Sequence, residues 1–188
     1  MAAPSRWGTV VFSILTALGE IMGTSAKAQG VKQWKVGDPA PAFSLPSDQG
    51  KPISLSDFKG KYLVIYFYPK DDTPGCTVEA CSFRDNVSGI RKLGAEVVGV
   101  SLDPVKSHEK FRDKFRLNFP LLADEKIEMS KAYGTYQEKS MYGKTYWGLV
   151  RNTYIVGPDG KIAKIYEKVK PAEHTQEVVE FLRSVVKK

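Results

Sequence analysis

The sequence predicts an α/β fold with a central mixed β-sheet flanked by helices. Continuous apolar runs rich in β-branched and aromatic residues occur at 62–67 and 96–101, and such runs are typical of strands buried on both faces. Apolar residues recur at helical spacing from Ala80 onward and again at 173–187. Strands that alternate with helices indicate a sheet covered on both faces.

Further strands are predicted from turn signals. The triplets at 43–45 and 53–55 flank a turn-rich stretch and predict a short hairpin, which follows a lead-in over 29–42. A weaker apolar run at 119–124 predicts a third buried strand. Two more strands should flank the Gly-Pro-Asp-Gly turn at 157–160.

Two helix boundaries also have sequence signals. Asp103 and Pro104 predict a helix start, because an Asp side chain can cap a helix and Pro suits its first position. The last helix, at about 173–187, is followed by the C-terminal lysine, whose charge suits a helix C-terminus.

Composition excludes few functions. The chain has 188 residues, of which 42% are hydrophobic and 26% charged, and this suits one globular domain able to bury a core. The net charge is +7, but no run of five or more like charges occurs. We therefore favour solvated charged faces over a nucleic-acid surface and predict no nucleic-acid partner.

The first residues differ from the rest. A basic residue precedes an apolar run at 9–18, and residues 26–28 fit a small-x-small cleavage site, which is the order of a secretory signal peptide. The run is shorter than a bilayer span needs, and Glu20 follows it. We predict a cleaved signal peptide at 1–28, a mature domain at 29–188, and export to a periplasm, a thylakoid lumen or the cell exterior. A retained anchor and an organelle transit peptide are the alternatives.

Both cysteines lie in the stretch "PKDDTPGCTVEAC" at 69–81. Cys76 stands four residues before Ala80 and so falls in the first turn of the expected helix. The helix dipole and the unpaired N–H groups there stabilise a thiolate. Thr73 places a hydroxyl three residues before the sulfur, where it can bond the thiolate or a bound oxygen ligand. These residues suggest an activated nucleophile.

The spacing of the cysteines argues against a structural disulfide. Five residues of helix separate the Cα atoms of Cys76 and Cys81 by about 8–9 Å, whereas a disulfide needs about 4.4–6.8 Å. A bond between them requires unwinding, which favours a working redox pair. Two inert thiols are an alternative. A zinc site with His108 and His174 is another, at no familiar ligand spacing; His108 is expected to be half-buried and His174 exposed.

The same stretch resembles a known family. Pro69, Thr73 and Cys76 match the Pro-x-x-x-Thr-x-x-Cys motif of peroxiredoxins, and "TPGCTVEAC" is similar to the peroxiredoxin Q or bacterioferritin comigratory protein subfamily. The resemblance extends over roughly 36–187 and includes "RNTYIVGPDGKI". It implies a thioredoxin-like fold and a thiol-dependent peroxidase that reduces hydrogen peroxide and organic hydroperoxides.

The resemblance also implies how the two cysteines work. Cys76 would be the peroxidatic cysteine and Cys81 the resolving cysteine, joined during the cycle by an intramolecular disulfide. A thioredoxin-type donor would reduce that disulfide, and no metal, haem or flavin is implied. Because the resolving cysteine lies in the same chain, a monomer is expected.

Four other residues acquire roles from the same resemblance. Thr73 would hold the peroxide, and Pro69 would shield the site from water. Arg151 would be the active-site arginine, a fixed positive donor, since arginine is not deprotonated in proteins. Glu79 occupies a position where the subfamily has Glu or Gln, and we treat it as a supporting residue.

Two rival functions use the same fold. A thiol–disulfide oxidoreductase is one, although its usual Cys-x-x-Cys signature is absent. A non-enzymatic thioredoxin-fold binding protein with inert cysteines is the other. The N-terminal extension departs from the cytosolic relatives and puts the identity of the electron donor in doubt, because exported compartments often oxidise thiols.

Overall fold

The computed structural model describes Met1, residues 33–141 and residues 143–186. A five-stranded sheet of order β5-β4-β3-β8-β9 forms the centre of this part of the chain. Its strands are β3 (Tyr62–Phe67), β4 (Ala95–Ser101), β5 (Leu121–Ala123), β8 (Thr153–Val156) and β9 (Ile162–Tyr166). β3, β4 and β5 are parallel, whereas β8 is antiparallel to both β3 and β9. The predicted mixed sheet is confirmed.

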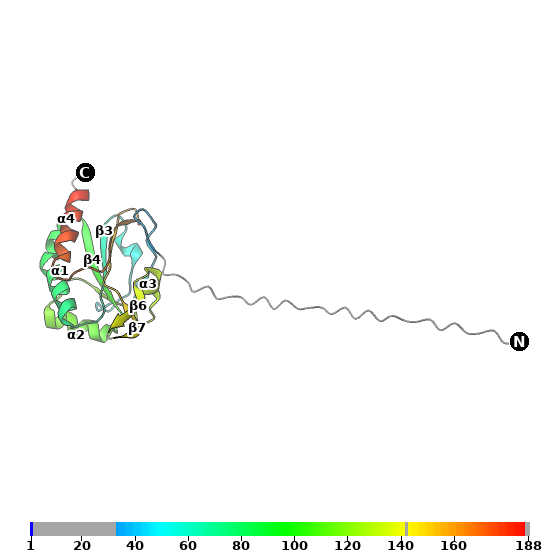
Figure 1. Ribbon diagram of the computed structural model, residues 1–188. Helices are drawn as coiled ribbons and strands as arrows, with labels where there is room; N and C mark the ends of the chain where they lie inside the picture. The colour runs from blue at the N-terminus through cyan, green and yellow to red at the C-terminus, as the bar shows by residue number, and fades with distance from the viewer. Residues whose placement is uncertain (2–32, 142, 187–188) are drawn as a thin grey trace.

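Helices cover the sheet on both sides (Figure 1). They are α1 (Pro74–Lys92), α2 (Val105–Phe115), α3 (Glu128–Ala132) and α4 (His174–Val186). One core cluster joins Tyr66 of β3 to Phe83 of α1, Phe111 of α2 and Leu182 of α4. A second cluster, on the other face of the sheet, includes Met129 of α3. The helices therefore form two layers around the sheet, as the sequence pattern indicates.

Strand β3 is buried on both faces because its side chains alternate between the two clusters. Val64 and Tyr66 point into the cluster beneath α1 and α4, whereas Leu63, Ile65 and Phe67 belong to the opposite one. This double burial explains the unbroken apolar run. β3 ends at Phe67, and residues 68–73 connect it directly to α1.

The predicted hairpins are present. β1 (Ser44–Leu45) pairs antiparallel with β2 (Ile53–Ser54), and β8 and β9 flank the turn at 157–160. The expected strand at 119–124 is shorter than predicted, since β5 includes only three residues.

Several elements were not predicted. A further hairpin consists of β6 (Tyr136–Met141) and β7 (Lys144–Leu149), which form a separate two-stranded sheet. A 3-10 turn, η1 (Leu55–Phe58), follows β2, and α3 follows β5. These segments are short or largely polar, so neither a run of apolar residues nor a helical stripe marks them.

The predicted start of α2 is wrong by one position. α2 begins at Val105 and Pro104 is the flanking residue, with no side chain capping the helix. The Asp103 carboxylate instead accepts hydrogen bonds from the hydroxyl of Ser101 at 2.7 Å and the backbone N–H of Asp71 at 2.9 Å. Asp103 is therefore used to attach the loop after β3.

Both histidines are more buried than predicted. His174 was expected to be exposed, yet it is 1% exposed, because its ring packs edge-on against Phe83 and Tyr166 and its Nε2 lies 2.8 Å from Thr153 Oγ1. His108 was expected to be half-buried and is fully buried. Each histidine is enclosed by a neighbouring element that its own helix pattern does not reveal.

The predicted signal peptide lies, apart from Met1, outside the described residues. Among the helices that the structure describes, none combines the length and the apolar character needed to cross a membrane.

Candidate functional site

Cys76 lies in the first turn of α1, as predicted from the sequence. The helix begins here because Thr73 has an extended backbone and Pro74 occupies the first helical position, where a missing N–H is tolerated. The backbone N–H of Thr77 donates to the carbonyl of Thr73 at 2.8 Å and closes the first helical hydrogen bond. The Cys76 sulfur therefore lies at the end of the helix where the dipole is positive.

Arg151 contacts this sulfur directly. Its Nη2 lies 3.2 Å from Cys76 Sγ, and its Nη1 donates to Oε2 of Glu79. Arg151 lies in the connection between β7 and β8, so residues 75 positions apart in the sequence meet here. Cys76 is only 2% exposed, and a charge next to a buried sulfur interacts more strongly than it would in water.

Glu79 supports Arg151 from within the protein. Its side chain is fully buried, and Oε1 has no hydrogen-bond partner in the part of the chain that the structure describes. Burial raises the pKa of Glu79 to about 7, although the charge and hydrogen bond of Arg151 lower it in part. Near neutral pH, Glu79 therefore changes between an ion-pair partner of Arg151 and a neutral acid.

Thr73 and Pro69 lie on the loop that approaches the site. The Thr73 side chain is half-buried, and its hydroxyl donates to the carbonyl of Lys70 at 3.1 Å. A hydroxyl that donates one bond keeps its lone pairs for an O–H group of a ligand. Pro69 is exposed, two residues after the end of β3.

Cys81 lies on the same unbroken helix as Cys76. It is half-buried, and both cysteines are free thiols. In continuous helical geometry their Cα atoms are about 8–9 Å apart, beyond the reach of a disulfide. The structure thus shows the reduced form, in which the two sulfurs are not bonded to each other.

The zinc alternative gains no support from the positions of the histidines. His108 Nδ1 lies 2.9 Å from Asp71 Oδ2, whereas His174, the first residue of α4, contacts Thr153. No group of three or more potential metal-ligating side chains occurs among residues 33–141 and 143–186.

Two residues near the site were missed by the sequence reasoning. Asp71 is buried in the loop before Cys76, and only its position within the motif stretch could have drawn attention to it. Lys139 is on the unpredicted β6–β7 hairpin, and its Nζ donates to the carbonyl of Leu149 at 2.8 Å. Burial and the charge of Arg151 lower the pKa of Lys139, while Cys76 raises it, so this lysine belongs to the same electrostatic environment.

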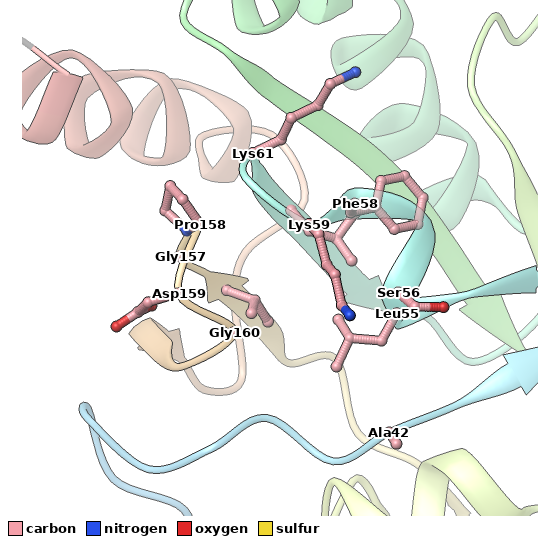
Figure 2. Close-up of a pocket in the computed structure, with 12 residues that line it drawn as sticks. Ala42, Leu55, Ser56, Phe58, Lys59, Lys61, Gly157, Pro158, Asp159 and Gly160 are labelled. Atoms are coloured by element: carbon pink, nitrogen blue, oxygen red, sulfur yellow. The ribbon is translucent and has the colours of Figure 1, made fainter.

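A cavity of about 410 Å³ lies elsewhere in the molecule. Figure 2 shows its lining side chains, among them Leu55 and Phe58, with the turn at 157–160 on one side. Leu63, in the first half of β3, also lines it, whereas Cys76 follows the other end of that strand. The cavity is thus separate from the cysteine site.

Comparison with known proteins agrees with this geometry. The AhpC/TSA family model matches residues 36–165. The peroxiredoxin Bcp of Bacillus subtilis is 41% identical over 154 residues, which are 82% of this chain and 98% of that protein. The peroxiredoxin Bcp of Escherichia coli is 42% identical over 149 residues, which are 79% of this chain and 96% of the relative.

Solved structures give the same result. The bacterioferritin comigratory protein of Xanthomonas campestris, whose structures concern its alkyl peroxide reduction activity, is similar with a TM-score of 0.76 and 36% identity, covering 81% of this chain and 99% of that one. A mutant of PrxQ from Xylella fastidiosa gives a TM-score of 0.77 at 34% identity, covering 81% and 98%. The chain therefore belongs to the AhpC/TSA family and, within it, to the peroxiredoxin Q or Bcp group of thiol-dependent peroxidases.

Proposed function

We propose that this chain reduces hydrogen peroxide and organic hydroperoxides, with Cys76 as the peroxidatic cysteine. The observation that carries the proposal is the 3.2 Å contact between Arg151 Nη2 and the buried sulfur of Cys76, at the start of α1. A permanent cation and a helix N-terminus both favour the thiolate, which is the nucleophilic form of cysteine.

The first step oxidises Cys76. Its thiolate attacks one oxygen of the peroxide, so that a sulfur–oxygen bond forms and the O–O bond breaks. Cys76 becomes a sulfenic acid. The rest of the substrate leaves as an alkoxide or hydroxide, which takes up a proton. Arg151 stabilises the charge that develops on the breaking bond, because its donors are already in place. Thr73, at the loop end, holds the second oxygen.

The second step joins the two cysteines. The Cys81 thiolate attacks the sulfur of the sulfenic acid, a disulfide forms, and hydroxide leaves and is protonated to water. Because both residues lie on one continuous helix, the first turns of α1 must unwind. A thioredoxin-type dithiol then reduces the disulfide by thiol–disulfide exchange, which returns both thiols.

Intact mass spectrometry tests this cycle. The mature protein is treated with one equivalent of hydrogen peroxide, free thiols are alkylated, and peptides are mapped. We expect loss of two hydrogens with Cys76 and Cys81 joined, a trapped sulfenic acid in Cys81→Ser, and no reaction in Cys76→Ser. Two thiols that persist after peroxide would contradict the function and favour a binding protein with inert cysteines. Reduction of insulin without peroxidase activity would favour a thiol–disulfide oxidoreductase.

We also propose that the protein is exported after cleavage behind residue 28 and works as a monomer without a nucleic-acid partner. The order of basic start, apolar run and small residues supports export. A resolving cysteine on the same helix as the peroxidatic one supports the monomer. Mass determination of protein from the exporting cell tests the cleavage, and the elution volume on a sizing column tests the monomeric state.

A further inference from the structure

The loop at 68–73, which leads from β3 to α1, is held by one buried carboxylate. Asp71 is 7% exposed, and its side chain is surrounded by three donors. The hydroxyl of Tyr68 donates to Oδ1 at 2.7 Å, and the hydroxyl of Ser107 donates to Oδ2 at 2.7 Å. His108 donates from Nδ1 to the same Oδ2 at 2.9 Å. Two of the three donors belong to α2, so this side chain ties the loop to that helix.

The backbone of Asp71 is tied to the same region. Its N–H donates to Asp103 Oδ2 at 2.9 Å, and that oxygen also accepts from the hydroxyl of Ser101 at 2.7 Å. The Ser101 oxygen in turn accepts from the backbone N–H of Asp103 at 3.0 Å. The side chain of Asp71 is therefore fixed to α2, and its main chain is fixed to the segment that joins β4 to α2.

Among the described residues, His108 uses only one of its two ring nitrogens, and that nitrogen donates a hydrogen bond to Asp71. The ring is fully buried, and Nε2 has no hydrogen-bond partner in the described part of the chain. A buried polar atom without a hydrogen-bond partner is unfavourable. Nε2 of His108 is unpaired in this part of the chain, whereas Nδ1 of the same ring donates to Asp71. We conclude that the structural contribution of His108 is this Nδ1 hydrogen bond.

Asp71 lies two residues before Thr73, the residue that flanks the start of α1. Asp72 follows with a left-handed backbone (φ 54°), and Thr73 comes next, with its hydroxyl on the carbonyl of Lys70. A single residue, Asp72, with its constrained backbone, thus separates the buried Asp71 from Thr73, the residue that precedes α1. A shift of Asp71 would move Thr73 relative to the sulfur of Cys76.

We propose that Asp71 and His108 are positioning residues for the peroxide step: they hold the loop at 68–73 so that Thr73 meets a peroxide bound at Cys76. The inference rests on the proposed function, and it adds a buried hydrogen-bond cluster on α2 to the residues on which the reaction depends. Neither residue touches the substrate. They act through the geometry of Thr73, where a displacement of about 1 Å can slow a reaction by up to about 100-fold.

The test separates reaction with peroxide from reactivity of the thiol. Second-order rate constants are measured for the pre-reduced full chain with hydrogen peroxide and with iodoacetamide, which needs only the thiolate. We expect Asp71→Asn and His108→Leu to react with peroxide about ten-fold more slowly, with alkylation of Cys76 changed by less than about two-fold. His108→Asn should recover most of the peroxide rate, because the Asn amide donates from nearly the position of Nδ1 and the unpaired Nε2 contributes nothing.

Asp124→Asn is the matched control. Asp124 is also fully buried, and its carboxylate accepts three hydrogen bonds, from the backbone N–H groups of Glu128, Met129 and Ser130. It lies at the start of α3, on the other side of the sheet from α1. This variant should be less stable to heat and yet keep the ratio of the two rate constants.

Three outcomes would overturn the positioning role. One is a peroxide rate in Asp71→Asn and His108→Leu equal to that of the unchanged protein. Another is an equal loss of both reactions, which indicates damage to the thiolate. The third is the same selective loss in Asp124→Asn, which indicates general destabilisation. The unchanged protein distinguishes the two proposals: if it reacts with peroxide no faster than Cys76→Ser, the proposed function itself fails, and the positioning role with it.

Discussion

Glu79 and Asp71 are buried carboxylates on either side of Cys76 in the sequence, and their pKa values move in opposite directions. Burial raises the pKa of Glu79 to about 7, since Arg151 offsets only part of the effect. Burial would also raise the pKa of Asp71, but the hydrogen bond and charge of His108, with bonds from Ser107 and Tyr68, bring it below its usual value.

The difference lies in the number of donors. Glu79 has one partner side chain and an oxygen without any, whereas Asp71 accepts three hydrogen bonds from side chains. Hydrogen bonds to the ionised form lower a carboxyl pKa, and desolvation raises it. The region therefore combines Asp71, a carboxylate that is ionised at neutral pH and holds the loop, with Glu79, which titrates near neutral pH beside the arginine that contacts the sulfur.

Replacement of Arg151, the hydrogen-bond partner of Glu79, should have the largest effect on the reaction with peroxide. In Arg151→Gln the sulfur loses its cationic donor, so we expect the second-order rate constant for peroxide to fall about 10²–10³-fold, as for the loss of one transition-state donor elsewhere. Stopped-flow oxidation of the pre-reduced protein measures it. Arg183→Gln, which changes an exposed arginine on α4, is the control and should react normally. A loss of less than about three-fold in Arg151→Gln would remove Arg151 from the mechanism.

The next largest effect concerns stability. Folded Glu79 binds its proton more tightly than the unfolded chain, whose carboxyl titrates near 4.5. The free energy of unfolding should therefore fall as the pH rises from about 4.5 to 7, by up to about 3 kcal/mol. Glu79→Gln should remove this decline. Urea unfolding at intervals between pH 5 and pH 8 measures both curves, and parallel curves for the two proteins would show that Glu79 ionises normally.

Asp71 should act in the opposite sense. Because its folded pKa lies below the ordinary value of 3.8, its contribution to stability is present at neutral pH and is lost only as the pH falls below that value. The two carboxylates thus affect different pH ranges, and the comparison is tested when the series of unfolding curves is extended from the range of pH 5 to pH 8 to values below 3.8.

The sequence predicts one of these carboxylates and not the other. The cysteine pair, Thr73 and the sheet follow from local patterns and a motif, and Glu79 lies in the helix that these patterns predict. Asp71 acquires its role from Ser107 and His108, residues more than 30 positions away. Arg151 was identified through a resemblance, because no local pattern brings a loop after β7 to the start of α1. Periodicity and turn signals do not predict contacts between elements that are distant in the sequence.

A smaller effect is expected at the buried His174. Burial lowers its pKa, while Glu177 partly raises it. Since the unfolded histidine binds a proton more readily, stability should be lost as the pH falls below about 6.5, opposite to the contribution of Glu79. His174→Gln should lose about 1 kcal/mol at pH 7, because its amide replaces only part of the contact with Thr153.

The measurement is the slope of stability against pH between pH 7 and pH 5. His174→Gln should be less sensitive to acid over this range than the unchanged protein. An identical slope in both proteins would mean that His174 is protonated in the fold as readily as in the unfolded chain.

The smallest effect is expected next to Asp71, at Asp72. Its carboxylate pairs with Lys114 at 2.6 Å, but the two side chains are 47% and 58% exposed, and exposed ion pairs contribute about 0–1 kcal/mol. Asn tolerates the left-handed backbone of this position, so Asp72→Asn removes the charge without new strain. We expect a loss below about 0.5 kcal/mol that disappears in high salt. If Asp72→Asn and Asp71→Asn were equally destabilising in urea at both salt concentrations, burial and donor number could not be what distinguishes neighbouring carboxylates in this loop.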